Sequence, residues 1–131
     1  LFPYTSLFRS LRQQGIRTGI ASSNGIELVE TVLKAQGIQE YLESVHTCCE
    51  VPKGKPAPDI YLLVAETLGV KPEECLVFED VPMGILAGKN AGMRVCAVED
   101  TFSASQREEK KELADYYIES YDEIPRERMQ P

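Results

Sequence analysis

Short apolar runs alternate along the chain with segments in which apolar residues recur at every third or fourth position. The short runs are typical of strands buried in a parallel sheet and fall at residues 16–21, 44–48, 75–78, 93–98 and 116–118. Helical spacing follows the first four of these runs, at residues 26–37, 60–69, 85–92 and 106–114, and a further helix ends within residues 11–15. Strands that alternate with helices are joined by right-handed crossovers, so the pattern predicts a three-layer α/β/α, Rossmann-like fold with a mostly parallel sheet.

The expected helices have identifiable ends. Glycine readily adopts the left-handed conformation that closes a helix, and it follows four of them, at Gly15, Gly37, Gly69 and Gly92. Pro82 stands where the first turn of a helix tolerates a missing N–H group. Ser103 or Ser105 is expected to cap the charged helix at residues 106–114.

Composition narrows the class of protein. The 131 residues, 43% hydrophobic and 27% charged, suit one globular domain, and a net charge of −7 argues against a nucleic-acid or anionic-membrane partner. Cys48, Cys49, Cys75 and Cys96 show no C-x-x-C spacing, and His46, the one histidine, cannot complete a usual zinc set. Such cysteine usage fits a reducing compartment, so we expect a cytoplasmic protein. No apolar run reaches the length of a membrane span, and the sequence indicates no oligomeric state.

The first ten residues stand apart from the rest. The segment 1–10, LFPYTSLFRS, lacks an initial methionine and closely resembles the translation of a sequencing adaptor. We therefore expect residues 1–10 to be non-native, the native sequence to begin near Leu11, and an upstream part of the protein to be missing. In the alternative interpretation these residues are an ordinary amphipathic lead-in helix.

Two adjacent acids end the strand at residues 75–78. Glu79 and Asp80 follow the apolar run directly, at the strand end where open α/β sheets place their ligands. Carboxylate oxygens are the ligands that Mg²⁺ prefers, and one or two of them suffice when phosphate and water complete the coordination. The pair therefore predicts a magnesium site, with two solvated acids in a turn as the alternative.

Two further polar segments lie at equivalent places. Ser22, Ser23 and Asn24 join a strand to a helix and can offer hydroxyls and free N–H groups to a phosphate, although Ser23 or Asn24 capping the helix is the simpler explanation. Lys55 stands on a proline-stiffened loop before the next helix and is either a fixed cation for phosphate or a solvated charge. Because the carboxyl ends of parallel strands share one edge, we expect Ser22, Lys55 and the Glu79–Asp80 pair to converge. That set suits phosphoryl transfer, in which positioning and charge neutralisation dominate.

Three motifs resemble the haloacid dehalogenase superfamily, and within it the phosphatases related to β-phosphoglucomutase. They are Ile20-Ala21-Ser22-Ser23-Asn24, Gly54-Lys55-Pro56-Ala57-Pro58-Asp59-Ile60-Tyr61, and Val77-Phe78-Glu79-Asp80 followed by Gly84 and Ala91-Gly92-Met93. The similarity runs from about Leu11 to Ile124. It implies that Ser22 hydrogen-bonds the transferring phosphoryl group, that Lys55 neutralises charge, and that Asp80, helped by Glu79, holds Mg²⁺.

The sequence departs from this family in one respect. The nucleophile and general acid/base of the family belong to an Asp-x-Asp motif after a first strand, whereas the aspartates here are only Asp59, Asp80, Asp100, Asp115 and Asp122. We therefore expect a partial core, residues 1–131, that lacks the first strand and the cap domain. The strand at 16–21 then either pairs directly with the strand at 75–78 or leaves a gap beside it.

The resemblance implies a magnesium-dependent phosphatase that acts on a small phosphorylated metabolite, such as a sugar phosphate, through an aspartyl-phosphate. A mutase of the β-phosphoglucomutase type is the alternative for the whole protein. A non-catalytic, receiver-like module that binds phosphate and Mg²⁺ is a second alternative, although the order of serine, lysine and acids differs from that of receiver domains. Without the Asp-x-Asp motif, the 131 residues alone are expected to show no phosphatase activity.

Overall fold

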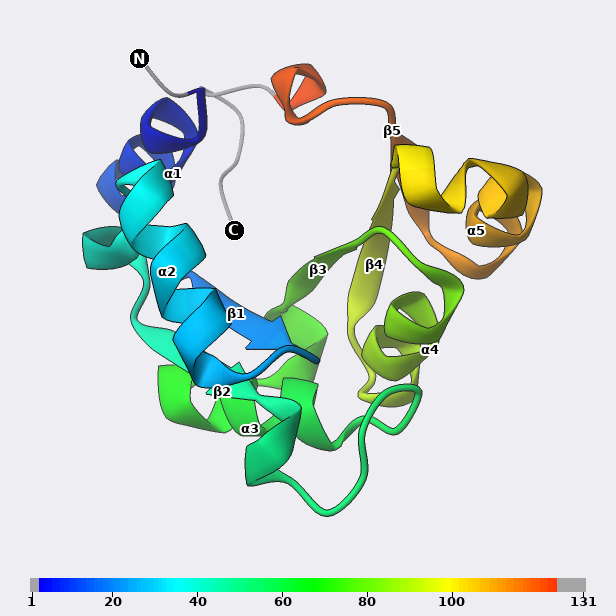
Figure 1. Ribbon diagram of the computed structural model, residues 1–131, viewed down its shortest axis with the longest axis horizontal. Coiled ribbons are helices and arrows are strands. Elements are labelled where there is room, and N and C mark those ends of the chain that lie inside the picture. The colour runs from blue at the N-terminus through cyan, green and yellow to red at the C-terminus, as the bar shows by residue number, and fades with distance from the viewer. Residues whose placement is uncertain (1–2, 125–131) are drawn as a thin grey trace.

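The computed structural model describes residues 3–124 (Figure 1). The strands are β1 (Gly19–Ser22), β2 (Ser44–Thr47), β3 (Leu76–Glu79), β4 (Arg94–Val98) and β5 (Tyr116–Ile118). The helices are α1 (Pro3–Gln13), α2 (Ile26–Gln36), α3 (Asp59–Leu68), α4 (Pro82–Asn90) and α5 (Arg107–Leu113). Strands and helices alternate in the predicted order, and the late edge strand has the predicted bounds.

The strands form two parallel sheets rather than one. β1 pairs with β2, and β3, β4 and β5 form a second sheet in that order. Within residues 3–124, no backbone ladder joins β1 to β3. Of the two arrangements expected from the sequence, direct pairing is therefore wrong and the gap is what the structure shows.

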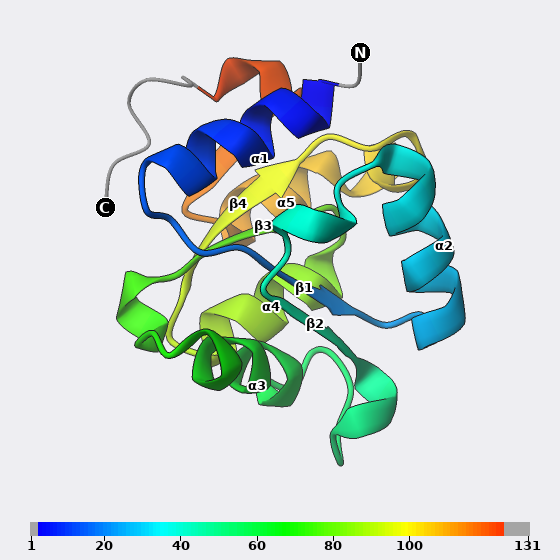
Figure 2. The same cartoon turned by 90° about the vertical axis from the view of Figure 1, so that its left-hand side faces the viewer.

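Helices cover both faces of the strands, which confirms the predicted three layers. On one face, residues of α3 and α4 such as Ile60 and Ile85 pack with Val77 of β3 and Val95 of β4. On the other face, α2 packs on β1 and β2, and α1 packs near Phe78 of β3. Figure 2 shows α1 above the strands and α3 and α4 below them. The core under α3 and α4 also includes Ala21 of β1, so it spans both sheets.

Several element ends differ from the prediction because side chains make other bonds. The N-cap of α2 is Gly25 without a side-chain hydrogen bond, so capping by Ser23 or Asn24 is wrong. The N-cap of α5 is Gln106, so capping by Ser103 or Ser105 is also wrong. The glycine stops are correct: Gly37 and Gly69, for example, have φ values of 67° and 70°, which an L side chain rarely adopts.

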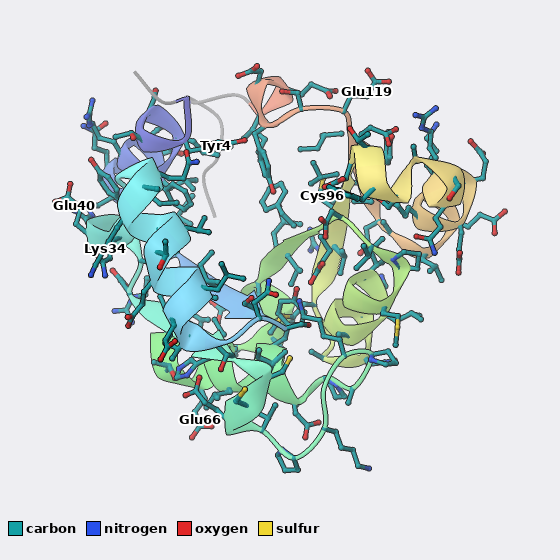
Figure 3. The ribbon with its side chains drawn as sticks, in the orientation of Figure 1. Tyr4, Lys34, Glu40, Glu66, Cys96 and Glu119 are labelled. Carbon is teal, nitrogen blue, oxygen red and sulfur yellow. The ribbon has the colours of Figure 1, made fainter. Side chains whose placement is uncertain are left out.

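The N-terminal helix is part of the packed structure. Leu7 and Leu11 of α1 are buried together with Ile124. Residues 3–10 therefore belong to a helix, in line with the lead-in interpretation, while the expectation that they are non-native stays a prediction. Charged side chains such as Lys34, Glu40 and Glu66 lie on the outer surface (Figure 3). In the described part of the chain, no helix is both long and apolar enough to cross a bilayer.

Candidate active site

Lys55 spans the gap between the two sheets. Its Nζ donates a hydrogen bond to the Ala21 carbonyl oxygen at the end of β1, over 3.1 Å, and pairs with Glu79 Oε2 at the end of β3, over 2.5 Å. The Lys55 side chain is 12% exposed and that of Glu79 is 7% exposed. Two sequence-predicted site residues, Lys55 and Glu79, are thus brought together at the edge where they were expected to meet.

Glu79 is enclosed by its neighbours. The hydroxyl of Tyr61 on α3 donates to the same carboxylate oxygen that Lys55 binds. Gly84 of α4 lies directly against the carboxylate, since a Cβ on this residue would stand 2.1 Å from Glu79 Cδ. Burial, followed by the nearby Glu79 carboxylate, raises the pKa of Tyr61, so its hydroxyl stays a donor. Glu79 therefore already accepts hydrogen bonds from Lys55 and Tyr61, and these donors compete with any metal cation for its carboxylate.

The segment Ser22–Asn24 turns the chain from β1 into α2 beside this pair. Ser22 Oγ accepts a hydrogen bond from the Asn24 N–H group over 3.0 Å, which shapes the turn. Cys48 after β2 lies 3.7 Å from Ser23 Oγ. The N-cap of α2 is Gly25, so no side chain caps the first N–H groups of this helix. Uncapped N–H groups are what an anion-binding site at the start of a helix requires. Lys55 contacts this segment through the carbonyl of Ala21, the residue before Ser22.

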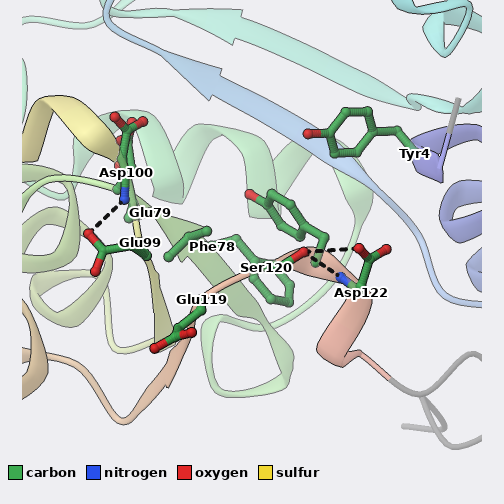
Figure 4. Close-up of a pocket in the computed structure, with 11 residues that line it drawn as sticks. Tyr4, Phe78, Glu79, Glu99, Asp100, Glu119, Ser120 and Asp122 are labelled. Carbon is green, nitrogen blue, oxygen red and sulfur yellow. Dashed lines mark hydrogen bonds between the residues drawn. The ribbon is translucent and has the colours of Figure 1, made fainter. Parts of the chain in front are cut away.

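Asp80 opens onto an acidic pocket of about 540 Å³ at the carboxyl ends of β3 and β4 (Figure 4). Its acidic lining residues are Glu79, Asp80, Glu99, Asp100, Glu119 and Asp122. Tyr4 of α1 lies across the pocket from Glu99 and Asp100. Burial raises the pKa of Asp80, and the adjacent Glu79 and Asp100 carboxylates raise it further.

The acids of this pocket differ in their partners. Glu99 accepts hydrogen bonds from Tyr117 and Arg107, which lower its pKa to about 2. Glu79 is paired with Lys55. Among residues 3–124, no lysine or arginine forms an ion pair with Asp80 or Asp100. Because the Asp80 and Asp100 carboxylates also repel each other, an added cation beside them would relieve repulsion.

The donor set fits a hard cation. In the described part of the chain, no group of three or more His, Cys, Asp or Glu side chains is arranged to enclose a metal ion. Mg²⁺ does not need such a cage, because it keeps several waters and takes one or two carboxylates together with a phosphate. Asp80, together with the nearby Asp100 and Glu79 carboxylates, offers oxygen ligands of the appropriate kind.

Some residues around the site were not found from the sequence. Tyr61 was noted only as part of a motif, yet it binds Glu79. Asp100 follows a strand just as Asp80 does, and this shared signal could have identified it. The Ser103 hydroxyl donates a hydrogen bond to the Asp80 carbonyl, and Lys110 donates one to that hydroxyl. No pattern in the sequence indicates this link.

A lysine, two acids and a strand-to-helix turn lie at one edge of parallel strands, an arrangement of the kind that α/β phosphoryl-transfer proteins use. A model of the haloacid dehalogenase-like hydrolases matches residues 2–92. The chain therefore belongs to the haloacid dehalogenase-like hydrolase family, and the receiver-like alternative is not retained.

Two relatives of the chain are named as phosphatases, and the chain matches part of the length of each. Hexitol phosphatase A of Escherichia coli is 40% identical over 93 residues, 71% of this chain and 43% of that protein. Fructose-1-phosphate phosphatase YqaB of Escherichia coli is 39% identical over 82 residues, 63% of this chain and 42% of that protein. The crystal structure of CbbY from Rhodobacter sphaeroides in complex with xylulose-1,5-bisphosphate has a TM-score of 0.83 and 28% identity, over 92% of this chain and 53% of that one. The chain thus spans about half of these proteins or less.

Proposed function

We propose that this chain carries the phosphate- and cation-binding part of a Mg²⁺-dependent phosphatase for small phosphorylated metabolites such as sugar phosphates. The names of the relatives support this substrate class, since they include a hexitol phosphatase and a fructose-1-phosphate phosphatase. A structural neighbour with a bound sugar bisphosphate supports it further. The four free thiols support a cytoplasmic setting.

The observation that carries the proposal is the position of Lys55 Nζ between the end of β1 and the end of β3. A cation held there by a backbone carbonyl and a buried carboxylate is fixed before any ligand arrives, so little entropy is lost on binding. It lies between the two segments that would have to share one phosphate: Ser22–Asn24 on one side and Glu79–Asp80 on the other.

Each residue has a defined task in this proposal. Ser22, Ser23 and Asn24 bind phosphate oxygens through hydroxyl and N–H groups, and Lys55 neutralises charge on the transferring group. Asp80 would hold Mg²⁺ directly, with Glu79 assisting through its contact with Lys55. When bound, Mg²⁺ would supply positive charge that screens the phosphate oxygens.

Magnesium binding by the chain itself tests this assignment. Isothermal titration of Mg²⁺ into the 131-residue protein is expected to show binding that Asp80→Asn abolishes, because this change removes the ligating carboxylate. Asp122→Asn is the matched control, since it removes one charge from the same pocket at a different wall. Absence of binding, or equal weakening by both variants, would contradict the proposed metal site.

Hydrolysis requires a nucleophile that these residues do not provide. The family resemblance assigns the aspartyl-phosphate to an Asp-x-Asp motif, which is absent from the sequence. We therefore propose that the 131 residues bind Mg²⁺ and phosphate without turnover. Incubation with p-nitrophenyl phosphate and Mg²⁺ is expected to release no p-nitrophenol, and robust Mg²⁺-dependent release by the pure protein would overturn this part.

A further inference from the structure

Lys110 is a buried cation that the proposed reaction does not yet use. It lies on α5 and is 0% exposed, although the rest of this helix is rich in solvated charge. Its Nζ donates to the Val98 carbonyl oxygen over 2.6 Å and to Ser103 Oγ over 2.9 Å. Among residues 3–124, no carboxylate forms an ion pair with it. Burying an ammonium group against neutral acceptors is costly, so this position needs an explanation.

Ser103 connects this lysine to the candidate cation site. Its hydroxyl, on a side chain that is 1% exposed, donates to the backbone carbonyl oxygen of Asp80 over 2.7 Å. An ammonium group can only donate hydrogen bonds, so Ser103 Oγ must accept from Lys110. The single hydrogen of the hydroxyl is then committed to Asp80. Lys110 thus sets the direction of the relay Lys110–Ser103–Asp80.

The relay acts at the point where the sheet ends. The β3–β4 ladder is registered only as far as Glu79 opposite Ala97, and Asp80 is the first residue beyond it. Lys110 holds the carbonyl of Val98 at the end of β4, while Ser103 holds that of Asp80 after β3. The ends of β3 and β4 are therefore joined by side chains at the point where the backbone ladder between the two strands stops.

We propose that Lys110 is a positioning residue for Asp80: through Ser103 it fixes the peptide group that carries the metal-binding carboxylate. This inference rests on the proposed function, since it assumes that Asp80 binds the cation. In other metal sites, groups outside the coordination shell that hydrogen-bond to the metal ligands and orient them strengthen metal binding by about ten- to 100-fold. The alternative is that Lys110 merely anchors α5, in which case stability would depend on it but the Mg²⁺ affinity of the folded protein would not.

Ser103→Ala tests the relay without changing the charge. We expect the dissociation constant for Mg²⁺, measured by isothermal titration on the folded 131-residue chain, to rise by at least about tenfold. Ser105→Ala is the matched control, because Ser105 is an exposed serine of the same segment. The Mg²⁺ dissociation constant of this variant is expected to equal that of the wild type. Equal constants for the two variants would overturn the inference. If the wild type bound no Mg²⁺, the proposed function would fail as well, so the two failures are distinguishable.

A double-mutant cycle tests whether Lys110 works through Ser103. Lys110→Met removes the orienting donor but also a positive charge, and only the second effect remains once Ser103 is alanine. Lys110→Met should therefore weaken Mg²⁺ binding more in the wild-type background than in the Ser103→Ala background. An equal factor in both backgrounds would show that Lys110 does not act through this hydroxyl. Lys111→Met, a neighbouring lysine over the Tyr117 ring, controls for loss of charge on α5. If the Lys110→Met protein does not fold, the comparison of Ser103→Ala with Ser105→Ala tests the inference by itself.

Discussion

Replacing Gly84 with alanine tests how tightly the Glu79 carboxylate is enclosed. The new Cβ would stand 2.1 Å from both Cδ and Oε1 of Glu79, whereas carbon atoms in contact are separated by about 3.5–4.0 Å. Glu79 has little room to move, because Lys55 and Tyr61 both hold its other oxygen. The substitution must therefore shift α4 away from β3 or push the carboxylate off its two donors.

The expected magnitude follows from opposing contributions. Alanine is favoured over glycine by about 1 kcal/mol in a helix interior, and Gly84 lies in the first turn of α4, so helix propensity alone predicts a gain of at most about this size. Overpacking of a well-packed core costs about 1–3 kcal/mol, and separating the partners of a buried ion pair costs about 3–5 kcal/mol. Net of the gain, a shift of α4 costs up to about 2 kcal/mol and loss of the two donors costs about 2–4 kcal/mol, so we expect the free energy of unfolding to fall by about 1–4 kcal/mol.

Urea unfolding followed by far-UV circular dichroism measures this change. Gly54→Ala is the control, since a Cβ there meets no atom within 4 Å and its stability should change by less than about 1 kcal/mol. In a Glu79→Ala background the clash is absent, and Gly84→Ala should become neutral or stabilising. A Gly84→Ala protein as stable as the wild type would refute the argument, because the close approach would then carry no cost.

Three further outcomes are expected from unfolding measurements. Tyr61→Phe leaves a buried carboxylate without one donor, so thermal unfolding should show a loss of about 1.5–3 kcal/mol. Lys55→Met removes the cation of a buried pair and should cost about 3–5 kcal/mol in urea, and an unchanged midpoint would contradict the bridging role. Hydrogen bonds from Tyr117 and Arg107 lower the pKa of Glu99 to about 2, so Glu99 stabilises the fold above its usual pKa and this contribution is lost as pH falls toward 2. Glu99→Gln should accordingly differ from the wild type at neutral pH and converge with it in acid.

The overall architecture could be predicted from the sequence because it depends on local pattern. Apolar runs and helical spacing located the strands and helices, and glycines such as Gly37 marked helix ends through a conformation that few other residues adopt. The caps could not be predicted in the same way. Serine and asparagine side chains can bond to several backbone groups: Ser22 accepts from the N–H group of Asn24, whereas the Ser103 hydroxyl donates to the Asp80 carbonyl.

The sequence predicted a set of site residues but not the contacts that connect them. Position at a strand end, or for Lys55 on the loop before a helix, predicted that Ser22, Lys55 and the Glu79–Asp80 pair lie at one edge, and the structure brings Lys55 and Glu79 into contact. The separation of 24 residues between them carries no information about pairing. Tyr61 and Lys110 act through tertiary contacts with partners far away in the sequence, so local pattern does not identify them.

The separation of the two sheets has a consequence for how the molecule opens. The β1–β2 ladder and the β3–β4–β5 ladder share no backbone hydrogen bond within residues 3–124, so each can break without the other. The two sheets are connected by side-chain packing under α3 and around Phe8 of α1, and by the Lys55 bridge. Native-state amide exchange should therefore resolve two cooperative units, with the two-stranded half exchanging at lower free energy than the three-stranded half.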